Sequence, residues 1–190
     1  NSSAASDVYK RQFTYGISTI HDADIQYARE KNVKIKLVAQ VVKVSDEHFT
    51  MFVMPEFVTP AKYIYSVDDE YNGVVIRGEC YDRQFMFGKG AGSLPTASSI
   101  LSDIMARLHG YRYEYKKLSY IQKPDYTTDI TLKIYVRYTD TDIHGILNFT
   151  KIHEQYTSEK SNYVIGDILL SELIAKRDRL CGDDVFVANI

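Results

Sequence analysis

The alternation of apolar and polar residues predicts mostly strands in the first half of the chain. Residues 33–44 and 48–58 are rich in β-branched and aromatic residues, alternate partly, and are separated by a Ser-Asp-Glu turn, so they are predicted to pair as strands. Before them, residues 21–32 place Ile25 and Ala28 on one helical face, with acidic residues early and basic residues late, as the helix dipole favours. A short helix and two further strands are then predicted over residues 61–67, 72–79 and 81–87.

A glycine-rich turn follows the last of these strands and leads into a predicted helix over residues 95–109. Pro95 suits the first helical turn, where its missing N–H costs nothing, and Gly110 is a natural stop. A single apolar stripe follows the period of a helix. The stripe consists of Ile100, Leu101, Ile104, Met105 and Leu108.

Beyond a Tyr-rich linker, residues 111–125, the pattern restarts with alternating strand-like and helix-like segments. The predicted order is strand, helix, strand, helix, strand over residues 130–138, 145–156, 162–170, 171–180 and 185–190. This alternation indicates a small α/β domain from residue 126 onward. The whole chain is therefore predicted to be α/β (α+β), with a mixed sheet that carries helices on one face, followed by this smaller domain.

Composition and charge exclude several classes of protein. The 23 Lys and Arg residues against 25 Asp and Glu residues give a net charge of −2, which is not the basic footprint of a nucleic-acid binder. The Tyr-rich segment 111–117 interleaves aromatic and basic residues as a single-strand binder does, but an extended connector that covers apolar surface is the simpler interpretation. No apolar run approaches the length of a membrane helix.

The cysteines and the opening residues set the expected compartment and the limits of the fold. Cys80 and Cys181 are far apart and have no metal-ligand spacing, so we expect no metal, no disulfide framework and a cytoplasmic location. Residues 1–12 are small and polar and resemble non-native read-through, so they are left out of the fold prediction. We expect the native protein to begin further upstream.

The glycine turn has two possible interpretations from its residues alone. A strand, a bare turn and a helix start can bind an anion or a dinucleotide, because free N–H groups at a helix N-terminus point outward. However, a G-x-G-x-x-G fingerprint would need glycine where Ser93 stands, and Gly90 stands where a Walker A motif needs Ser or Thr. A close approach of backbones without any cofactor is the alternative.

A family resemblance rests on these same residues. The segment "FGKGAGSLPTASSILSDI" resembles the G-x-GAG-x-x-PTA-x-x-x-x-x-D segment of homoserine dehydrogenases, and "YGISTIHDADIQYAREKNVKIKLVAQV" and "SVDDEYNGVVIRGE" are similar to the family's preceding sequence. The resemblance covers residues 13–110 in the same order. Tyr15 departs from it, because the family has an acidic residue before Gly-Ile.

The resemblance implies an NAD- or NADP-dependent oxidoreductase that interconverts L-homoserine and L-aspartate 4-semialdehyde in threonine and methionine biosynthesis, working as a homodimer. Residues 13–110 would be the later half of its substrate and dimerisation domain, with Gly92 contacting the coenzyme beside Gly90 and Ala91. The Rossmann domain, the proton acceptor and the substrate carboxylates would lie upstream. No catalytic residue is therefore assigned, and the chain alone is predicted to be inactive.

The tail resembles a second family. "DIHGIL", residues 142–147, resembles the D-x-P-G-x-L turn of ACT domains, with His144 in place of proline. This likeness implies amino-acid binding at Gly145, and the alternative is a packing or dimer-forming module without a ligand. Only three strands are predicted here, whereas an ACT domain has four. The segment from Asp140 also imitates half of an EF-hand loop, but Lys151 stands at the position that needs glutamate.

Overall fold

The computed structural model describes residues 12–112, 123–159 and 161–190, and the chain forms two compact units. Unit 1 combines the residues up to Val58 with those from Lys123 onward, and unit 2 is residues Thr59–Gln122. Most of the Tyr-rich segment 111–117 lies outside the described residues. Strands dominate over helices and form a mixed sheet, which confirms the predicted α/β class.

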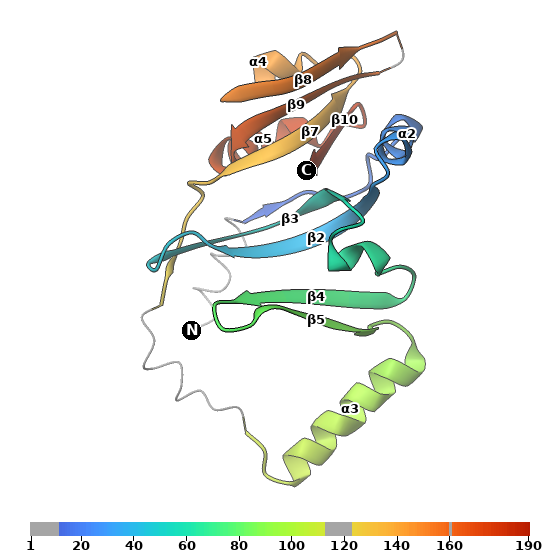
Figure 1. Ribbon diagram of the computed structural model, residues 1–190, viewed down its shortest axis with the longest axis vertical. Helices are drawn as coiled ribbons and strands as arrows, with labels where there is room; N and C mark the ends of the chain where they lie inside the picture. The colour runs from blue at the N-terminus through green and yellow to red at the C-terminus, as the bar shows by residue number, and fades with distance from the viewer. Residues whose placement is uncertain (1–11, 113–122, 160) are drawn as a thin grey trace. The chain divides into compact units, whose positions relative to one another are not determined.

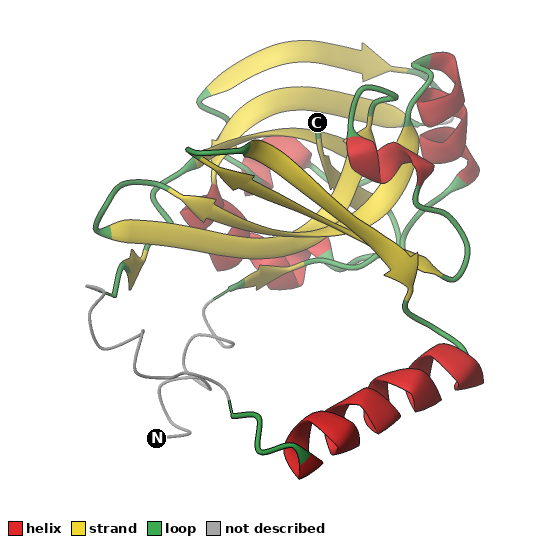
Figure 2. Ribbon diagram, turned by 60° about the horizontal axis from the view of Figure 1, so that its bottom comes forward, coloured by secondary structure: helices red, strands yellow, loops and turns green. Residues whose placement is uncertain are grey.

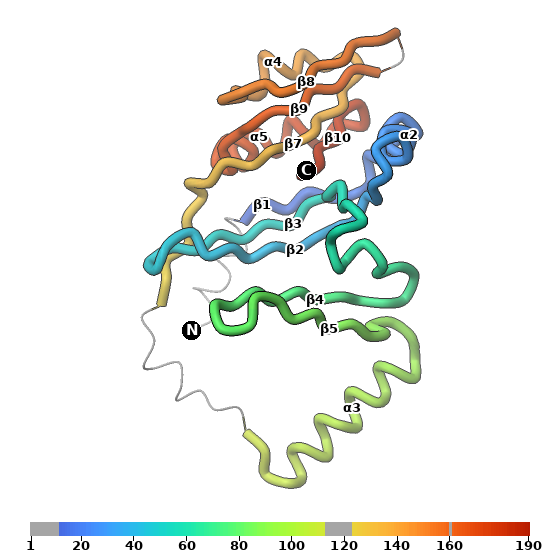
Figure 3. The backbone as a smooth tube through the Cα atoms, in the orientation of Figure 1, coloured from blue at the N-terminus to red at the C-terminus, as the bar shows by residue number. Residues whose placement is uncertain are grey.

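The first segment of unit 1 is a long hairpin with a helix before it. The strands β2 and β3 pair antiparallel throughout, as predicted, and the short strand β1 lies parallel to β3 (Figure 3). A second short strand, β6, also pairs parallel to β3. In the helix α2, Ala28 is buried as predicted, but Ile25 is 39% exposed, and Asp24 is buried instead. These elements span Phe13–Thr14 (β1), Asp22–Glu30 (α2), Lys34–Lys43 (β2), His48–Val58 (β3) and Asp125–Tyr126 (β6).

The tail of unit 1 folds in the order strand, helix, strand, strand, helix, strand. The elements are β7 (Thr131–Tyr138), α4 (Ile143–Ile146), β8 (Lys151–Thr157), β9 (Asn162–Leu169), α5 (Leu170–Leu180) and β10 (Val185–Asn189). Its four strands are all antiparallel and lie in the spatial order β10-β7-β9-β8 (Figure 1). This is the order of a ferredoxin-like β-α-β-β-α-β motif whose first helix is reduced to one turn.

The predicted helix over residues 145–156 is wrong. A single turn, α4, ends at Ile146, and β8 then runs from Lys151 to Thr157 as the edge strand beside β9. Every residue of β8 is exposed. Because neither face of the strand is buried, its sequence has no alternation of apolar and polar residues that would indicate a strand. Its Glu, Gln and Lys residues favour a helix locally. Pairing with β9 overrides that local preference.

The two segments of unit 1 share one sheet and one core. β10 pairs antiparallel with β7 on one side and makes a parallel contact with β3 on the other, where Asn189 lies opposite Glu56. The ring of Tyr135 packs against Phe57 and Tyr27 at centroid distances of 5.1 and 4.8 Å. The compact units therefore differ from the predicted domains 13–110 and 126–190, because the tail completes the core of the preceding segment.

Unit 2 consists of a hairpin, a helical turn and a long helix. These are η1 (Tyr63–Ser66), β4 (Tyr71–Gly78), β5 (Asp82–Lys89) and α3 (Ser93–Leu108). β5 leads through a short loop into α3 (Figure 2). The predicted apolar stripe of α3 is exposed along its whole length: from 45% at Met105 to 74% at Leu108. None of the helices in the described part of the chain has both the length and the apolar character needed to cross a membrane.

Candidate functional site

The predicted cofactor residues Gly90, Ala91 and Gly92 lie together in the exposed turn between β5 and α3. Gly92 is the residue that precedes the first turn of α3, and its backbone has φ 111° and ψ 156°. An L-residue with a side chain is strained in that conformation, so glycine is required there. The backbone geometry at Gly92 therefore requires a residue without a side chain, independently of any ligand.

Contacts from the start of β4 hold the other end of the turn. The Gly90 amide donates to the Glu70 carbonyl oxygen at 3.1 Å, and the Lys89 Nζ lies 2.8 Å from Glu70 Oε1. That hydrogen bond from Lys89 lowers the pKa of the Glu70 carboxyl. The side chain of Asn72 covers Gly90 so closely that an added Cβ would lie 1.6 Å from Asn72 Nδ2. A methyl group at Gly90 would therefore displace this exposed side chain, whereas glycine at position 92 is required for its backbone angles.

The N-terminus of α3 offers amide hydrogens to a ligand. The first-turn amides of Ser93 and Leu94 have no carbonyl partner inside the helix, and Gly92 has no side chain that could cap them. No acidic residue stands in the first turn. The carbonyl oxygen of Gly92 is already used, because it accepts from the Thr96 amide at 3.2 Å and from the Thr96 hydroxyl at 2.8 Å. The turn can therefore donate to an anionic group, as helix N-termini do.

Sequence reasoning found the glycines but missed the residues that support them. Glu70 and Asn72 lie some twenty positions earlier in the chain. The register of the hairpin brings them to the turn, since Asn72 pairs with Gly88 and Tyr71 with Lys89. The predicted strands over residues 72–79 and 81–87 contained this information, because a tight antiparallel hairpin places the start of one strand beside the end of the other.

The second predicted site, the tail turn of residues 142–147, is the helical turn α4 with its flanking residues. Asp142 caps it, accepting from the Gly145 amide at 3.1 Å. A Cβ on Gly145 would lie 2.5 Å from Asp142 Oδ2, so a side chain at this position would displace the capping carboxylate. The imidazole of His144 lies 6.3 Å from the ring of Tyr138 and 6.3 Å from that of Phe149, measured between centroids.

Comparison with known families identifies one match. The profile of the homoserine dehydrogenase family matches residues 4–105. The matched region runs from before β1 to the last turn of α3 and contains the glycine turn. It also includes most of the opening stretch that was left out of the fold prediction. The resemblance indicated by the glycine segment is thereby confirmed.

Curated relatives support the same family. The homoserine dehydrogenase of Bacillus subtilis is 31% identical over 97 residues, which are 51% of this chain and 22% of the relative. That of Mycobacterium leprae is 31% identical over 153 residues, which are 76% of this chain and 34% of the relative, so this similarity extends into the tail. The chain thus spans about a fifth to a third of the length of these relatives.

Solved structures share the fold over almost the whole chain. A homoserine dehydrogenase from Thiobacillus denitrificans superimposes with a TM-score of 0.68 at 23% identity, over 95% of this chain and 48% of that one. One from S. aureus gives a TM-score of 0.54 at 22% identity, over 91% of this chain and 45% of that one. The tail is therefore included in the shared fold.

Proposed function

Because the chain belongs to the homoserine dehydrogenase family, we propose that it forms part of an enzyme that interconverts L-homoserine and L-aspartate 4-semialdehyde with NAD or NADP. The family match over residues 4–105 is the observation that carries this proposal. When bound, the nicotinamide coenzyme takes up or gives back the hydride. The chain's own residues supply part of the surface on which the coenzyme lies.

The geometry of the glycine turn fits that role. Gly90, Ala91 and Gly92 are exposed and present no long side chain, so a flat or charged group can approach the backbone closely. The uncapped amides of Ser93 and Leu94 favour a negatively charged group at this end of α3. Gly92 is the central residue of the proposed contact.

An extended protein provides the direct test. The segment of the Bacillus subtilis relative that precedes the matched region is joined in front of residue 4, and formation of reduced coenzyme is followed with homoserine as substrate. We expect oxidation of homoserine by the fusion and none by the 190-residue chain alone, because proton transfer needs a positioned acceptor that the family places upstream. Activity of the chain alone would contradict the assignment of the missing groups.

A matched pair of variants tests the turn within that fusion. Gly92→Val blocks the backbone surface, and we expect coenzyme affinity to fall at least tenfold, or about 1.4 kcal/mol. Gly88→Ala is the control, because a Cβ there meets nothing within 4 Å. Thermal melting of both variants separates lost binding from lost folding. Unchanged affinity in a folded Gly92→Val protein would refute the coenzyme contact.

The assembly and location of the enzyme are also part of the proposal. We propose a homodimer in the cytoplasm. Free thiols are typical of a reducing compartment, and Cys80 and Cys181 are both exposed and unpaired. Light scattering of the purified fusion measures its mass. A monomeric mass at the concentrations used for activity would contradict the dimer.

A second candidate function concerns the tail. We propose that residues 126–190 form an ACT-type module that binds an amino acid at the 142–147 turn or joins two copies of the chain. The four antiparallel strands in the order β10-β7-β9-β8 favour this, since they supply the fourth strand that the sequence prediction lacked. Calorimetry with threonine tests binding, and Gly145→Ala is the control variant that crowds Asp142. Absence of heat at millimolar threonine would contradict a threonine site.

A further inference from the structure

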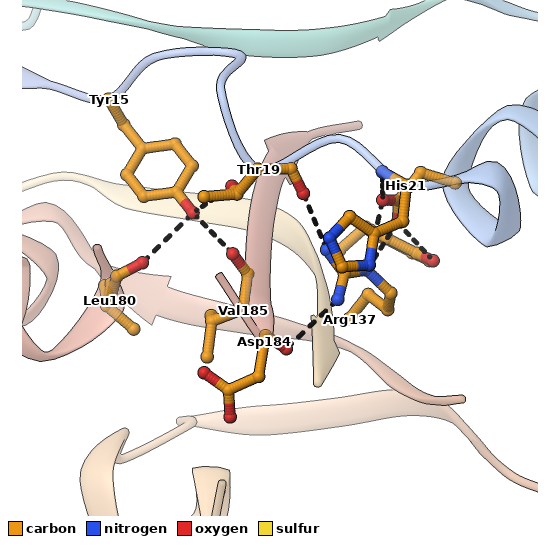
Figure 4. Close-up of polar contacts among 9 residues, drawn as sticks. Tyr15, Thr19, His21, Arg137, Leu180, Asp184 and Val185 are labelled. Carbon is orange, nitrogen blue, oxygen red and sulfur yellow. Dashed lines mark hydrogen bonds and ion pairs between the residues drawn. The ribbon is translucent and has the colours of Figure 1, made fainter. Parts of the chain in front are cut away.

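A buried arginine of β7, Arg137, joins three separate parts of unit 1 (Figure 4). Its Nε donates to Oδ1 and Oδ2 of Asp24 in α2 at 3.2 and 3.1 Å. Its Nη2 donates to the Thr19 carbonyl oxygen at 2.7 Å, and its Nη1 to the Asp184 carbonyl oxygen at 3.1 Å. The Tyr135 hydroxyl also donates to Asp24 Oδ1 at 3.2 Å. We call these five residues the Arg137 network.

The ion pair of the network, Arg137 with Asp24, is withdrawn from solvent. The side chain of Asp24 is 0% exposed and that of Arg137 is 2% exposed. Burial raises the pKa of the Asp24 carboxyl, and its hydrogen bonds and the nearby guanidinium oppose that rise. A buried ion pair gives little net stability over apolar residues of equal size, but the rigid fork of guanidinium donors fixes orientation. The Arg137 network therefore sets where α2 lies against the tail.

One end of the network reaches the first turn of α2. The Asp24 carboxylate also accepts a hydrogen bond from the His21 amide at 2.9 Å, and His21 is the residue that precedes the helix. The position of this carboxylate thus controls how firmly the helix start is held. The protection of the His21 amide against hydrogen exchange therefore reports on this hydrogen bond.

The other end reaches a loop of the tail. The Asp184 carboxylate, in the loop before β10, accepts from the Thr141 hydroxyl in the loop between β7 and α4. Thr141 is next to Asp142, which caps α4. A continuous set of contacts therefore leads from Thr141 through Asp184 to the guanidinium, and from there to α2.

We propose that the Arg137 network is a conformational relay, in which movement of the loop of residues 139–142 changes how firmly the first turn of α2 is held. Arg137 donates through a planar group whose N–H directions are fixed relative to one another. A shift of the Asp184 carbonyl therefore turns the whole guanidinium and weakens its bonds to Asp24. The relay is a property of this chain and needs neither substrate nor coenzyme.

Amide hydrogen exchange of the full chain tests the relay. Thr141→Val removes the hydroxyl that holds Asp184 and leaves α2 untouched. We expect exchange of the amides of residues 21–25 to accelerate by at least about threefold relative to the original chain, as local opening becomes easier. Thr150→Val is the matched control, because it removes a comparable hydroxyl bond, to the Asp167 carbonyl, elsewhere in the tail.

Further variants keep the test decisive. Thr141→Ser retains the hydroxyl and should exchange like the original chain. Asp184→Ala removes the same hydrogen bond from the other side, so combining it with Thr141→Val should add no further acceleration at residues 21–25. Unchanged exchange there in both single variants, or equal acceleration in Thr150→Val, would overturn the proposal.

Discussion

Two glycines of the turn at residues 88–92 are held there by different physical constraints. Gly92 has a backbone conformation that side chains rarely allow, whereas Gly90 lies under the side chain of Asn72. Gly88 has neither constraint, since a Cβ there meets nothing within 4 Å. Of the three glycines, one is therefore required by its backbone angles, one contacts a side chain that a methyl group would displace, and one is open to substitution.

We expect Gly90→Ala to destabilise the β4–β5 hairpin by up to about 1 kcal/mol, because the new methyl group displaces the exposed side chain of Asn72. The double variant Asn72→Ala with Gly90→Ala should recover most of that loss. Chemical denaturation of the original chain, of Gly90→Ala, of Asn72→Ala and of the double variant measures both effects. Additive losses in the double variant would contradict the packing argument.

Buried and partly buried tyrosines make the fold sensitive to alkaline pH. Burial raises the pKa values of Tyr15 and Tyr135, and burial together with the hydrogen bond to Glu154 raises that of Tyr163. Unfolded tyrosine loses its proton near pH 10, so above about pH 10 the unfolded chain binds fewer protons than the folded chain. The stability contributed by these groups is present below that pH and is lost as the pH rises further.

The expected result is a free energy of unfolding that begins to fall near about pH 10 and keeps falling as the pH rises further. Tyr135→Phe should make this fall shallower, because it removes one of the titrating hydroxyls. At neutral pH the same variant should lower the free energy of unfolding by about 1 kcal/mol, because the hydrogen bond to Asp24 is lost. Urea denaturation at several pH values provides the measurement. An equally steep fall in the variant would show that Tyr135 does not contribute.

At the scale of elements, the sequence predicts those whose own residues have a clear period or a clear boundary. The β2–β3 hairpin has β-branched strands around a polar turn, and α3 lies between Gly92 and Gly110. β8 has neither signal, so its residues predict a helix, and only its pairing with the following strand β9 defines it as a strand. The sequence also predicts the turn of the candidate site, but not the contacts of Glu70 and Asn72, which depend on strand register.

The strand β10 contributes most of its residues to the core. Val185, Phe186, Val187 and Ala188 are all fully buried, between β7 on one side and β3 on the other. We expect Phe186→Ala to lower the free energy of unfolding by about 3–5 kcal/mol through the cavity that it leaves. Ile190→Ala is the control, since Ile190 is 38% exposed. Equal losses in the two variants would contradict this role of β10.

At the scale of the whole molecule, the family match and the folding unit have different boundaries. The match ends at residue 105, whereas unit 1 needs residues from 123 onward to complete its core. Phe13, Phe52 and Met54 belong to the matched segment and are buried in a cluster that includes tail residues such as Val187. The tail therefore completes the core of the segment that precedes it.

A chain cut after residue 110 tests this. Although it contains the whole matched region, we expect it to lack a cooperative thermal transition and to bind a hydrophobic dye, because the cut exposes the core residues of β1 and β3. The 190-residue chain under the same conditions is the reference. A sharp, reversible transition in the shortened chain would show that residues 13–110 fold independently of the tail.

The position of β10 beside β3 has a consequence for the nascent polypeptide. On the ribosome, β3 emerges long before the strand that covers it, and all of unit 2 is synthesised in between. Contacts between such distant segments form slowly, and apolar strands that wait for a partner are prone to aggregate. Chaperones that shield β1 and β3 during translation should therefore raise the yield of this protein more than slower growth alone.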